Sequence, residues 1–298
     1  VEASAKSAAM LVFLDQQNSN PRQPNENYAR ELMELHTLGV DGGYTQKDVM
    51  EVARCFTGWT EERGFLRAKG SFKFEPTLHD PGAKVVLGEQ IPAGGGVKDG
   101  ERVVQLVANH PSTARHISRK LCRFFLGEMG VERLAPEVET TFAETQGDIK
   151  AMMRTLWQGY RRHQDWAPTL KRPLDYIASS LRALDANTDA GLALQRHLTA
   201  MGQPLHQWPM PDGYPDATAS CTGSLLARWN FAADLAANRI PGTGIDLAGL
   251  VRRGMPAHAP GLVAHRPDLS PSLARTLAGL DLTEQVGLML AAPEFQWR

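Results

Sequence analysis

The order of hydrophobic and polar positions along the chain is mainly that of amphipathic helices. Apolar residues recur at intervals of three and four, and polar turns rich in Gly, Pro or Asn separate these segments. The predicted helices cover residues 3–16, 25–38, 45–58, 99–109, 111–126, 135–145, 148–161, 173–185, 190–201, 222–238 and 271–292, the last broken near Gly279. Gly39 is predicted to end the second helix, and Thr45 with Asp48 resembles a capping box at the start of the third.

One stretch departs from the helical pattern. Residues 60–98 hold Gly, Pro and two short alternating runs, 72–74 and 84–87, around the turn at 79–82. Such runs predict short strands. The predicted fold class is therefore mainly α, a multi-helix globular domain with a small β-hairpin excursion around residues 70–90. We expect one domain over 1–298, with irregular loops at 202–216 and 239–268.

Composition limits the classes of partner. The 298 residues are 42% hydrophobic, which is enough for a sizeable core. The 32 basic and 33 acidic residues give a net charge of -1, which argues against a partner held by bulk charge, such as a nucleic acid backbone or an anionic membrane surface. No apolar run approaches the roughly 20 residues of a membrane span. We expect neither nucleic acid binding nor a membrane span.

The cysteines and the first residue add two expectations. Cys55, Cys122 and Cys221 are an odd number without a CxxC pair, so burial as small apolar side chains is favoured over disulfides or a thiolate zinc site. A chain that begins with Val1 and has no signal-like segment is expected to be a fragment or a processed form, and its own start does not indicate a cellular location.

The second predicted helix carries the densest charge pattern. Glu26, Arg30 and Glu34 form a ladder at i, i+4 and i+8, with Glu31 beside it. The structural interpretation is a solvated face with ion pairs. The functional interpretation is that Glu31 and Glu34 converge on a substrate or a hard cation, as an acid and a base or as ligands. His36 points about 160° away from Glu34 on the helical wheel, so these residues are no metal signature.

A second charged stripe lies on the helix predicted at 111–126. Arg115, Arg119 and Arg123 follow each other at i, i+4 and i+8. Three guanidinium groups could hold a phosphate, sulfate or carboxylate group. Pairing with the glutamates of the second helix is the favoured interpretation, because the net charge is balanced.

Two turns contain histidines that are candidates for chemistry. His79 is followed by Asp80, which could orient the imidazole for acid–base work or metal ligation, and Lys84 could offset negative charge. The alternative is a plain turn, since Asp-Pro-Gly is a common turn sequence. His110 precedes Pro111 at a helix start, where it could face a ligand near the positive helix end or be part of an ordinary entry turn.

The loop at 202–216 displays aromatic rings among four prolines. Trp208 and Tyr214 could stack on a sugar or an apolar substrate, but contact with the protein itself is the favoured interpretation. The sequence contains no nucleophile elbow, no phosphate-binding Gly loop and no HExxH motif. It identifies no metal and no cofactor.

Several segments together resemble one bacterial family. The run from Pro24 to Gly39 resembles the hallmark segment of the domain-of-unknown-function 1800 family. The resemblance continues through Gly43–Thr45, Thr57–Trp59, Phe72–Gly88, His110–Arg115, Lys171–Pro173, Pro211–Pro215, Arg228–Phe231 and Ala292–Phe295. It spans nearly the whole chain, although family members usually have a helical region before this point and more often carry Trp where Tyr214 stands.

The resemblance implies a setting but no reaction. Members commonly look exported, often with a twin-arginine-type signal, and are commonly encoded beside a family similar to sulfatases and alkaline phosphatases. It implies a periplasmic or extracellular protein, a polymeric or anionic substrate and a sulfatase- or phosphatase-like partner protein. This context is association and not mechanism.

Two hypotheses follow, and the sequence leaves open whether the protein is an enzyme. The first is a hydrolase-type enzyme that acts on an envelope polymer by acid–base or metal-assisted chemistry. Its catalytic residues would be Glu31, Glu34, His79 and Asp80, and its binding residues Arg30, Lys84, His110, Arg115, Trp208 and Tyr214. The second is a non-enzymatic binding or assembly module of the cell envelope, in which the same charges are structural ion pairs.

Overall fold

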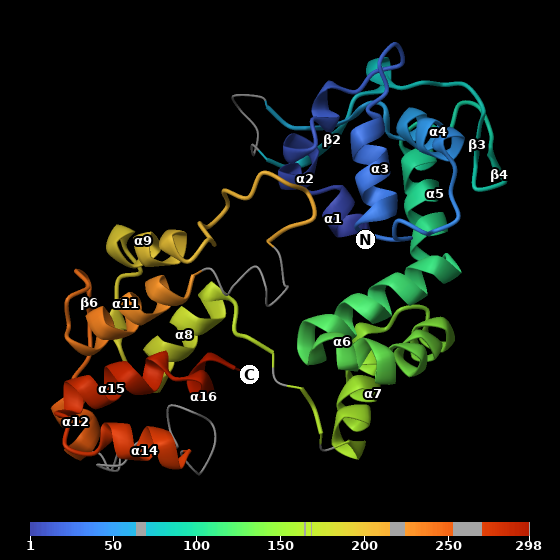
Figure 1. The fold of residues 1–298 in the computed structure, drawn as a ribbon. Coiled ribbons are helices and arrows are strands. Elements are labelled where there is room, and N and C mark those ends of the chain that lie inside the picture. The colour runs from blue at the N-terminus through green and yellow to red at the C-terminus, as the bar shows by residue number, and fades with distance from the viewer. Residues whose placement is uncertain (64–69, 164, 168, 215–223, 253–269, 298) are drawn as a thin grey trace. The chain divides into compact units, whose positions relative to one another are not determined.

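A computed structural model describes residues 1–63, 70–163, 165–167, 169–214, 224–252 and 270–297. Its contacts divide the chain into two compact units, Val1–Trp166 (unit 1) and Ala167–Arg298 (unit 2), which we describe separately (Figure 1). The mainly α fold class is confirmed, since helices dominate both units and the described strands form two-stranded antiparallel sheets. One domain over 1–298 stays a prediction about cooperative folding.

Unit 1 consists of short helices, two hairpins and a pair of long helices. The helices are α1 (Glu2–Ala5), α2 (Ala8–Phe13), α3 (Glu26–Glu34), α4 (Gln46–Phe56), α5 (Val97–Ala108), α6 (Pro111–Thr145) and α7 (Ile149–Arg162), with 3-10 turns η1 (Gln16–Asn18) and η2 (Pro76–Leu78). The strands are β1 (Trp59–Glu61), β2 (Phe72–Phe74), β3 (Lys84–Val86) and β4 (Glu89–Ile91).

The predicted strands exist, but they do not pair with each other. β2 pairs with β1, and β3 pairs with β4. The reason for the second pairing is local: Leu87 and Gly88 both have positive φ, 51° and 82°. Two such residues in succession make the tight turn that closes a two-residue hairpin.

The helix boundaries follow the predicted capping signals with two differences. Thr45 and Asp48 form the predicted capping box at the start of α4. The predicted helix at 3–16 is interrupted, because the Ser7 side chain accepts from the backbone of Met10 and starts α2 anew. The helix predicted at 25–38 ends at Glu34, and residues 35–38 form a wide turn before Gly39, which has a φ of 85°.

Helix α6 joins two predicted helices across a kink. Gly127 has a φ of 66° and a ψ of -161°, a conformation that is accessible to glycine and strained for other residues. The helical conformation is interrupted at this residue, and the segments on both sides contribute apolar residues to the core shared with α7. The predicted segments 111–126 and 135–145 therefore become the two parts of α6.

Unit 1 has two apolar cores. One is built from α2 to α5 and the hairpins, and contains the edge-to-face rings of Tyr28, Phe56 and Trp59. The other lies between α6 and α7. Cys55 is buried in the first core and Cys122 in the second, as predicted, whereas Cys221 lies outside the described residues.

Unit 2 is a helical cluster with its own core. Its elements are α8 (Pro173–Ala183), β5 (Asn187–Thr188), α9 (Leu192–Ala200), α11 (Leu225–Ala236), β6 (Thr243–Gly244), α12 (Leu247–Arg252), α14 (Pro271–Leu277), α15 (Leu282–Ala291) and α16 (Pro293–Gln296). β6 and α12 lie in a region that the sequence predicted to be irregular. The predicted break near Gly279 is confirmed between α14 and α15.

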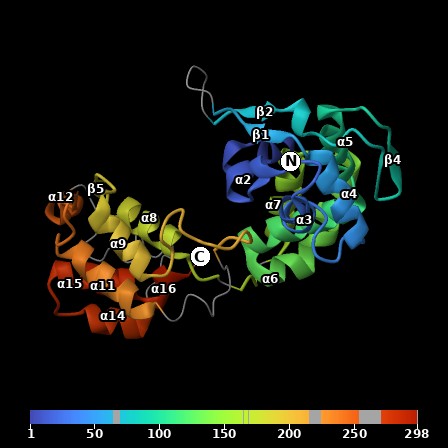
Figure 2. The same ribbon diagram turned by 90° about the horizontal axis from the view of Figure 1, so that it is seen from above.

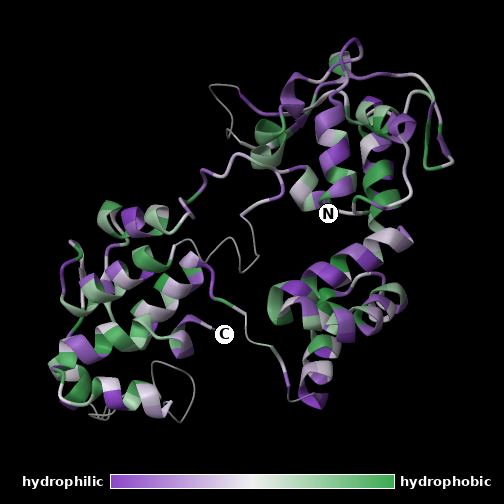
Figure 3. Cartoon of the chain, viewed as in Figure 1, coloured by the Kyte–Doolittle hydropathy of each residue, from purple (hydrophilic) through white to green (hydrophobic). Residues whose placement is uncertain are grey.

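Helix α15 is central to unit 2. It packs along α11 and also contacts α14 and α16 (Figures 1 and 2). Hydrophobic and hydrophilic residues alternate in bands along the helices of both units (Figure 3). The buried side chains Phe231, Val286 and Leu290 lie in the core that joins α11 and α15. No helix among the described residues is long and apolar enough to cross a membrane.

Candidate functional site

The polar residues predicted around the 79–82 turn form a buried network. The side chains of His79, Lys84 and Asp99 are exposed by 5%, 0% and 2%. Lys84 Nζ lies 2.6 Å from Asp99 Oδ2 and also donates to the backbone oxygen of Asp80. His79 Nε2 lies 3.2 Å from the same Asp99 oxygen. The charges of this network are therefore held by partners within unit 1.

The prediction that Asp80 orients His79 is wrong. The imidazole is held by Asp99 at Nε2 and by the backbone oxygen of Thr57, 2.8 Å from Nδ1. The Asp80 carboxylate instead accepts from Arg54, with Nε at 2.8 Å. The adjacent residues in sequence diverge because Thr57 Oγ1 accepts from the Asp80 backbone N–H and fixes the turn.

Arg54 forms ion pairs with two carboxylates at the edge of this network. Its guanidinium contacts both Asp80 and Glu51, and the hydrogen bond that it donates to Asp80 is the largest cause of the low pKa of that carboxyl. Glu51 also accepts from the backbone N–H of Val85 in β3. The pair Arg54–Asp80 thus ties α4 to the turn and hairpin that follow it.

The predicted glutamate ladder on α3 does not form a carboxylate pair in a pocket. Glu26 and Arg30 both contact the side-chain amide of Gln46, at 2.6 Å each, at the start of α4. Glu34 lies 3.4 Å from the hydroxyl of Tyr44. Glu31 is half-buried and is not without an interaction partner. The ladder therefore connects α3 to α4 and the loop between them.

The start of α6 contacts the end of α3, but through side chains that are not among the predicted site residues. His116 Nε2 and Lys120 Nζ each lie 3.1 Å from the backbone oxygen of Leu35. Arg115 is exposed and lies 3.7 Å from Glu139 on the same helix. Arg123 contacts Glu128 at 2.6 Å. Both of these arginine contacts lie within α6 and were not predicted. The pairing of the arginines with the glutamates of α3 stays a prediction.

His110 has the role of a helix cap. Its Nδ1 accepts from the backbone N–H of Ser112, 3.1 Å away, at the start of α6. Burial lowers the pKa of His110, which favours the neutral form that accepts this hydrogen bond. This geometry agrees with the entry-turn interpretation and leaves Nε2 as the remaining polar atom of the ring.

The aromatic loop contacts itself. The rings of Trp208 and Tyr214 lie 5.1 Å apart, and Trp208 Nε1 lies 3.4 Å from Asp212. This agrees with the favoured interpretation of the loop at 202–216, of which residues 215–216 lie outside the described chain. Among the residues that the structure describes, no group of three or more His, Cys, Asp or Glu could hold a metal ion.

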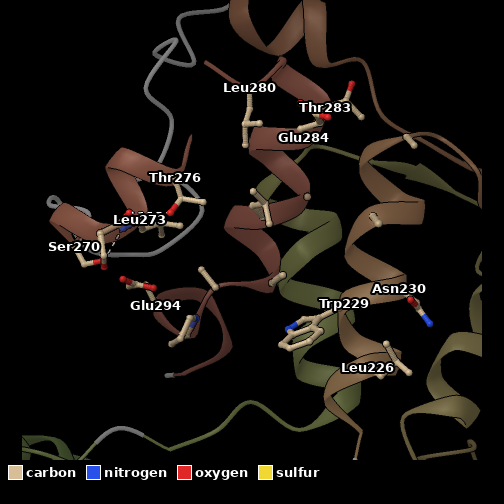
Figure 4. A pocket seen from close by; sticks show the side chains of 18 of the residues that line it. Leu226, Trp229, Asn230, Ser270, Leu273, Thr276, Leu280, Thr283, Glu284 and Glu294 are labelled. Atoms are coloured by element: carbon tan, nitrogen blue, oxygen red, sulfur yellow. Dashed lines mark hydrogen bonds between the residues drawn. The ribbon is translucent and has the colours of Figure 1, made fainter. Parts of the chain in front are cut away.

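An apolar groove that was not predicted lies in unit 2. This groove of about 980 Å³ runs between α11, α14 and α15 (Figure 4). Trp229 and Leu226, which line it from α11, are 50% and 67% exposed, and Leu288 on α15 is 40% exposed. Isolated exposed apolar residues are common, but a contiguous set in a concave surface is typical of an interaction site.

Small residues make the groove deep along two helices. Ala233 on α11 and the C-cap Ala237 line it on one side, and Gly287 and Ala291 line it from α15. These positions share one face with Trp229 on α11 and with Leu288 on α15, at helical spacing. The lining runs from Leu226 to the C-cap Ala237 along α11, or about 16 Å, and from Thr283 to Ala291 along α15, or about 12 Å. The sequence signal was present: α15 is apolar on almost all sides, which is typical of a helix with more than one packed face.

The ends of the groove differ in charge from its middle. Glu284 lies at the start of α15 and Glu294 at the start of α16, near the opposite ends of the groove (Figure 4). Arg239 also lines the groove, but its charge is offset by Asp234, 2.9 Å away. The net charge around the groove is therefore negative.

Comparison with known proteins identifies a family. Residues 1–297 match the model of the family described as "Protein of unknown function (DUF1800)". No curated protein and no solved structure matches the chain significantly.

Proposed function

Because this chain belongs to the DUF1800 family, whose description states no activity, we propose a function from the geometry: a non-enzymatic binding and assembly module. The groove of unit 2 receives an amphipathic helix of a protein partner. The observation that carries the proposal is the exposed apolar set Leu226, Trp229 and Leu288 around a groove as long as three helical turns.

The shape and charge of the groove support a helix as its occupant. An amphipathic helix places apolar side chains at i, i+3, i+4 and i+7 in such a groove and keeps its polar face in water. Glu284 and Glu294 favour a partner with basic residues at its ends. Trp229 is the expected energetic centre, because buried tryptophans dominate many interfaces.

The saturated polar network of unit 1 also supports a module. His79 and Lys84 are buried and both contact Asp99, so the polar groups of this network have their partners within unit 1. The setting we propose is the cell envelope, which rests on the export implied by the family resemblance. The partner protein and its relation to a sulfatase- or phosphatase-like enzyme stay proposals of the same kind.

The test uses a labelled helical peptide of about 14 residues, with Leu at i, i+3, i+4 and i+7 and Arg at both ends. Its binding to the full chain is measured by fluorescence polarisation. A peptide of the same composition without an apolar face is the control ligand. We expect Ala233→Leu, which fills the groove, and Trp229→Ser to weaken binding about tenfold or more.

A matched control variant is Leu192→Ala. Leu192 is 72% exposed on α9 and does not line the groove, so its removal should leave binding unchanged. The proposal fails if both peptides bind equally, if neither binds, or if the two groove variants bind like the wild type.

A hydrolase acting on an envelope polymer is the second candidate. One observation favours it: the contact of His79 Nε2 with Asp99, which is the kind of contact that orients a catalytic imidazole. Glu31→Gln, Glu34→Gln and His79→Gln are made singly, and melting temperature and activity on a polymer panel are measured. A folded, inactive variant supports the enzyme, whereas wild-type activity in every folded variant, or no activity in the wild type, removes the hypothesis.

A further inference from the structure

Unit 1 carries an exposed apolar face that no part of the proposed function uses. Phe124 on α6 and Ile149, Trp157 and Tyr160 on α7 are exposed by 39%, 53%, 41% and 40%. We name these four residues the α6–α7 face. Phe125 joins the two helices at this place, because its ring lies 4.9 Å from that of Phe124 and 5.5 Å from that of Trp157.

The rings of this face do not form a flat platform. The planes of Phe124 and Phe125 are 87° apart, those of Phe125 and Trp157 65°, and those of Trp157 and Tyr160 85°. Stacking of successive sugars or bases requires ring faces that are presented in the same direction. Insertion among lipid headgroups requires exposed apolar area, and the rings need not face in the same direction.

A row of cations lies beside the apolar residues. Lys150, Arg154 and Arg161 fall within about 60° of Trp157 on one side of the α7 wheel, at i-7, i-3 and i+4. Tyr160 and Ile149 fall within about 80° on the other side. All three cations are exposed. None of them forms an ion pair with another residue in the described ranges.

The next arginine on the same helix differs from the three cations of this row. Arg162, the next residue after Arg161, points to the other side of α7 and forms an ion pair with Glu137. Asp148, the N-cap of α7, lies on the wheel about 180° from Trp157. The row therefore carries three positive charges without a carboxylate on its own helix face.

We propose that the α6–α7 face docks the protein on the surface of an anionic lipid bilayer. The apolar side chains enter the headgroup region, where Trp and Tyr are favoured, and Lys150, Arg154 and Arg161 contact lipid phosphates. The near-neutral net charge of the chain does not oppose this docking, because attraction to a charged surface is screened beyond about 10 Å and depends on the local charge.

The test is flotation of the full chain with vesicles. We expect binding to vesicles of phosphatidylcholine and phosphatidylglycerol in equal parts, and no binding to phosphatidylcholine alone. Replacing Lys150, Arg154 and Arg161 together by Gln should lower the partition coefficient about a hundredfold, since each cation contributes a factor of about five. Ile149→Ser should lower it about tenfold and leave the salt dependence unchanged.

The control is a second triple variant with the same change of net charge. Arg22, Lys47 and Lys98 are exposed in unit 1 outside α6 and α7, and their replacement by Gln should leave flotation unchanged. Circular dichroism checks that both triple variants fold. The proposal is overturned if the wild type does not float with the anionic vesicles, if both triple variants lose binding equally, or if an acidic polysaccharide or single-stranded DNA competes fully with the vesicles.

Discussion

At the scale of single residues, the ion pairs of unit 1 include both buried and half-exposed ones. Lys84 and Asp99 are buried together, and each is the main partner of the other's charge. Arg54 and Asp80 are 28% and 17% exposed, and Arg54 has a second carboxylate in Glu51. Removal of one member of a buried pair leaves an uncompensated charge, whereas a half-exposed ion can recruit water.

Asp99→Asn should therefore lower the free energy of unfolding by about 3–5 kcal/mol. Asp80→Asn should lower it by about 1 kcal/mol or less, because Arg54 keeps Glu51 and water. Urea unfolding followed by circular dichroism at neutral pH measures both values. Equal effects of the two substitutions would contradict the division.

The same substitution at two helical glycines is predicted to change the free energy of unfolding in opposite directions. A Cβ added to Gly100 in α5 would lie 2.5 Å from Trp59 Cζ2, whereas one added to Gly287 in α15 would have its nearest neighbour at 3.6 Å. Gly100→Ala should lower the free energy of unfolding by about 1–3 kcal/mol through overpacking. Gly287→Ala should raise it by about 0.5–1 kcal/mol through helix propensity. A stabilising Gly100→Ala in thermal unfolding would refute the close contact.

At the scale of elements, the helix starts depend on local side chains that the sequence displays. His110 caps α6 through its neutral Nδ1, and burial holds its pKa below the ordinary 6.5. Between the folded and the ordinary pKa, the unfolded chain binds more protons than the folded chain, so the contribution of this group to stability falls as the pH falls through 6.5. His36 and His116 are shifted in the same direction, mainly by burial.

His110→Asn separates the cap from the titration. Asn is a good N-cap without a titrating ring, so the variant should be within about 0.5 kcal/mol of the wild type at pH 7, and it should lose less stability than the wild type between pH 7 and pH 5. His110→Ala should lose about 1 kcal/mol at pH 7. Urea midpoints at both pH values are the measurement, and equal pH dependence of wild type and His110→Asn would exclude the titration of His110 as a cause.

Elements were predictable where their signals are local. The capping box at Thr45 and the break near Gly279 depend on residues within one or two turns of each other. The partners of the buried charges were not predictable in the same way. Asp99 is twenty residues from His79 in sequence, and only the packing of α5 on the hairpins brings the two together. The groove was not predicted because its residues come from four helices, α11, α14, α15 and α16, which only the fold brings together.

At the scale of the whole molecule, the two units have separate apolar cores. The cores of unit 1 involve residues before 167, and the core of unit 2 involves residues after it. Each unit is within the ordinary size of an independently folding domain. The chain 1–166 and the chain 167–298 should each give helical circular dichroism and cooperative thermal unfolding. An unfolded fragment of either kind would support one cooperative domain over 1–298.

Each of the two apolar cores of unit 1 contains one buried thiol, whose reaction with a reagent can report the opening of that core. Burial raises the pKa of Cys55 to about 12 and that of Cys122 to about 11, so both stay protonated and shielded from alkylating reagents in the native state. A thiol in such a place reacts only when the core around it opens. The rates of alkylation at the two positions therefore compare how often the α2–α5 core and the α6–α7 core open under native conditions.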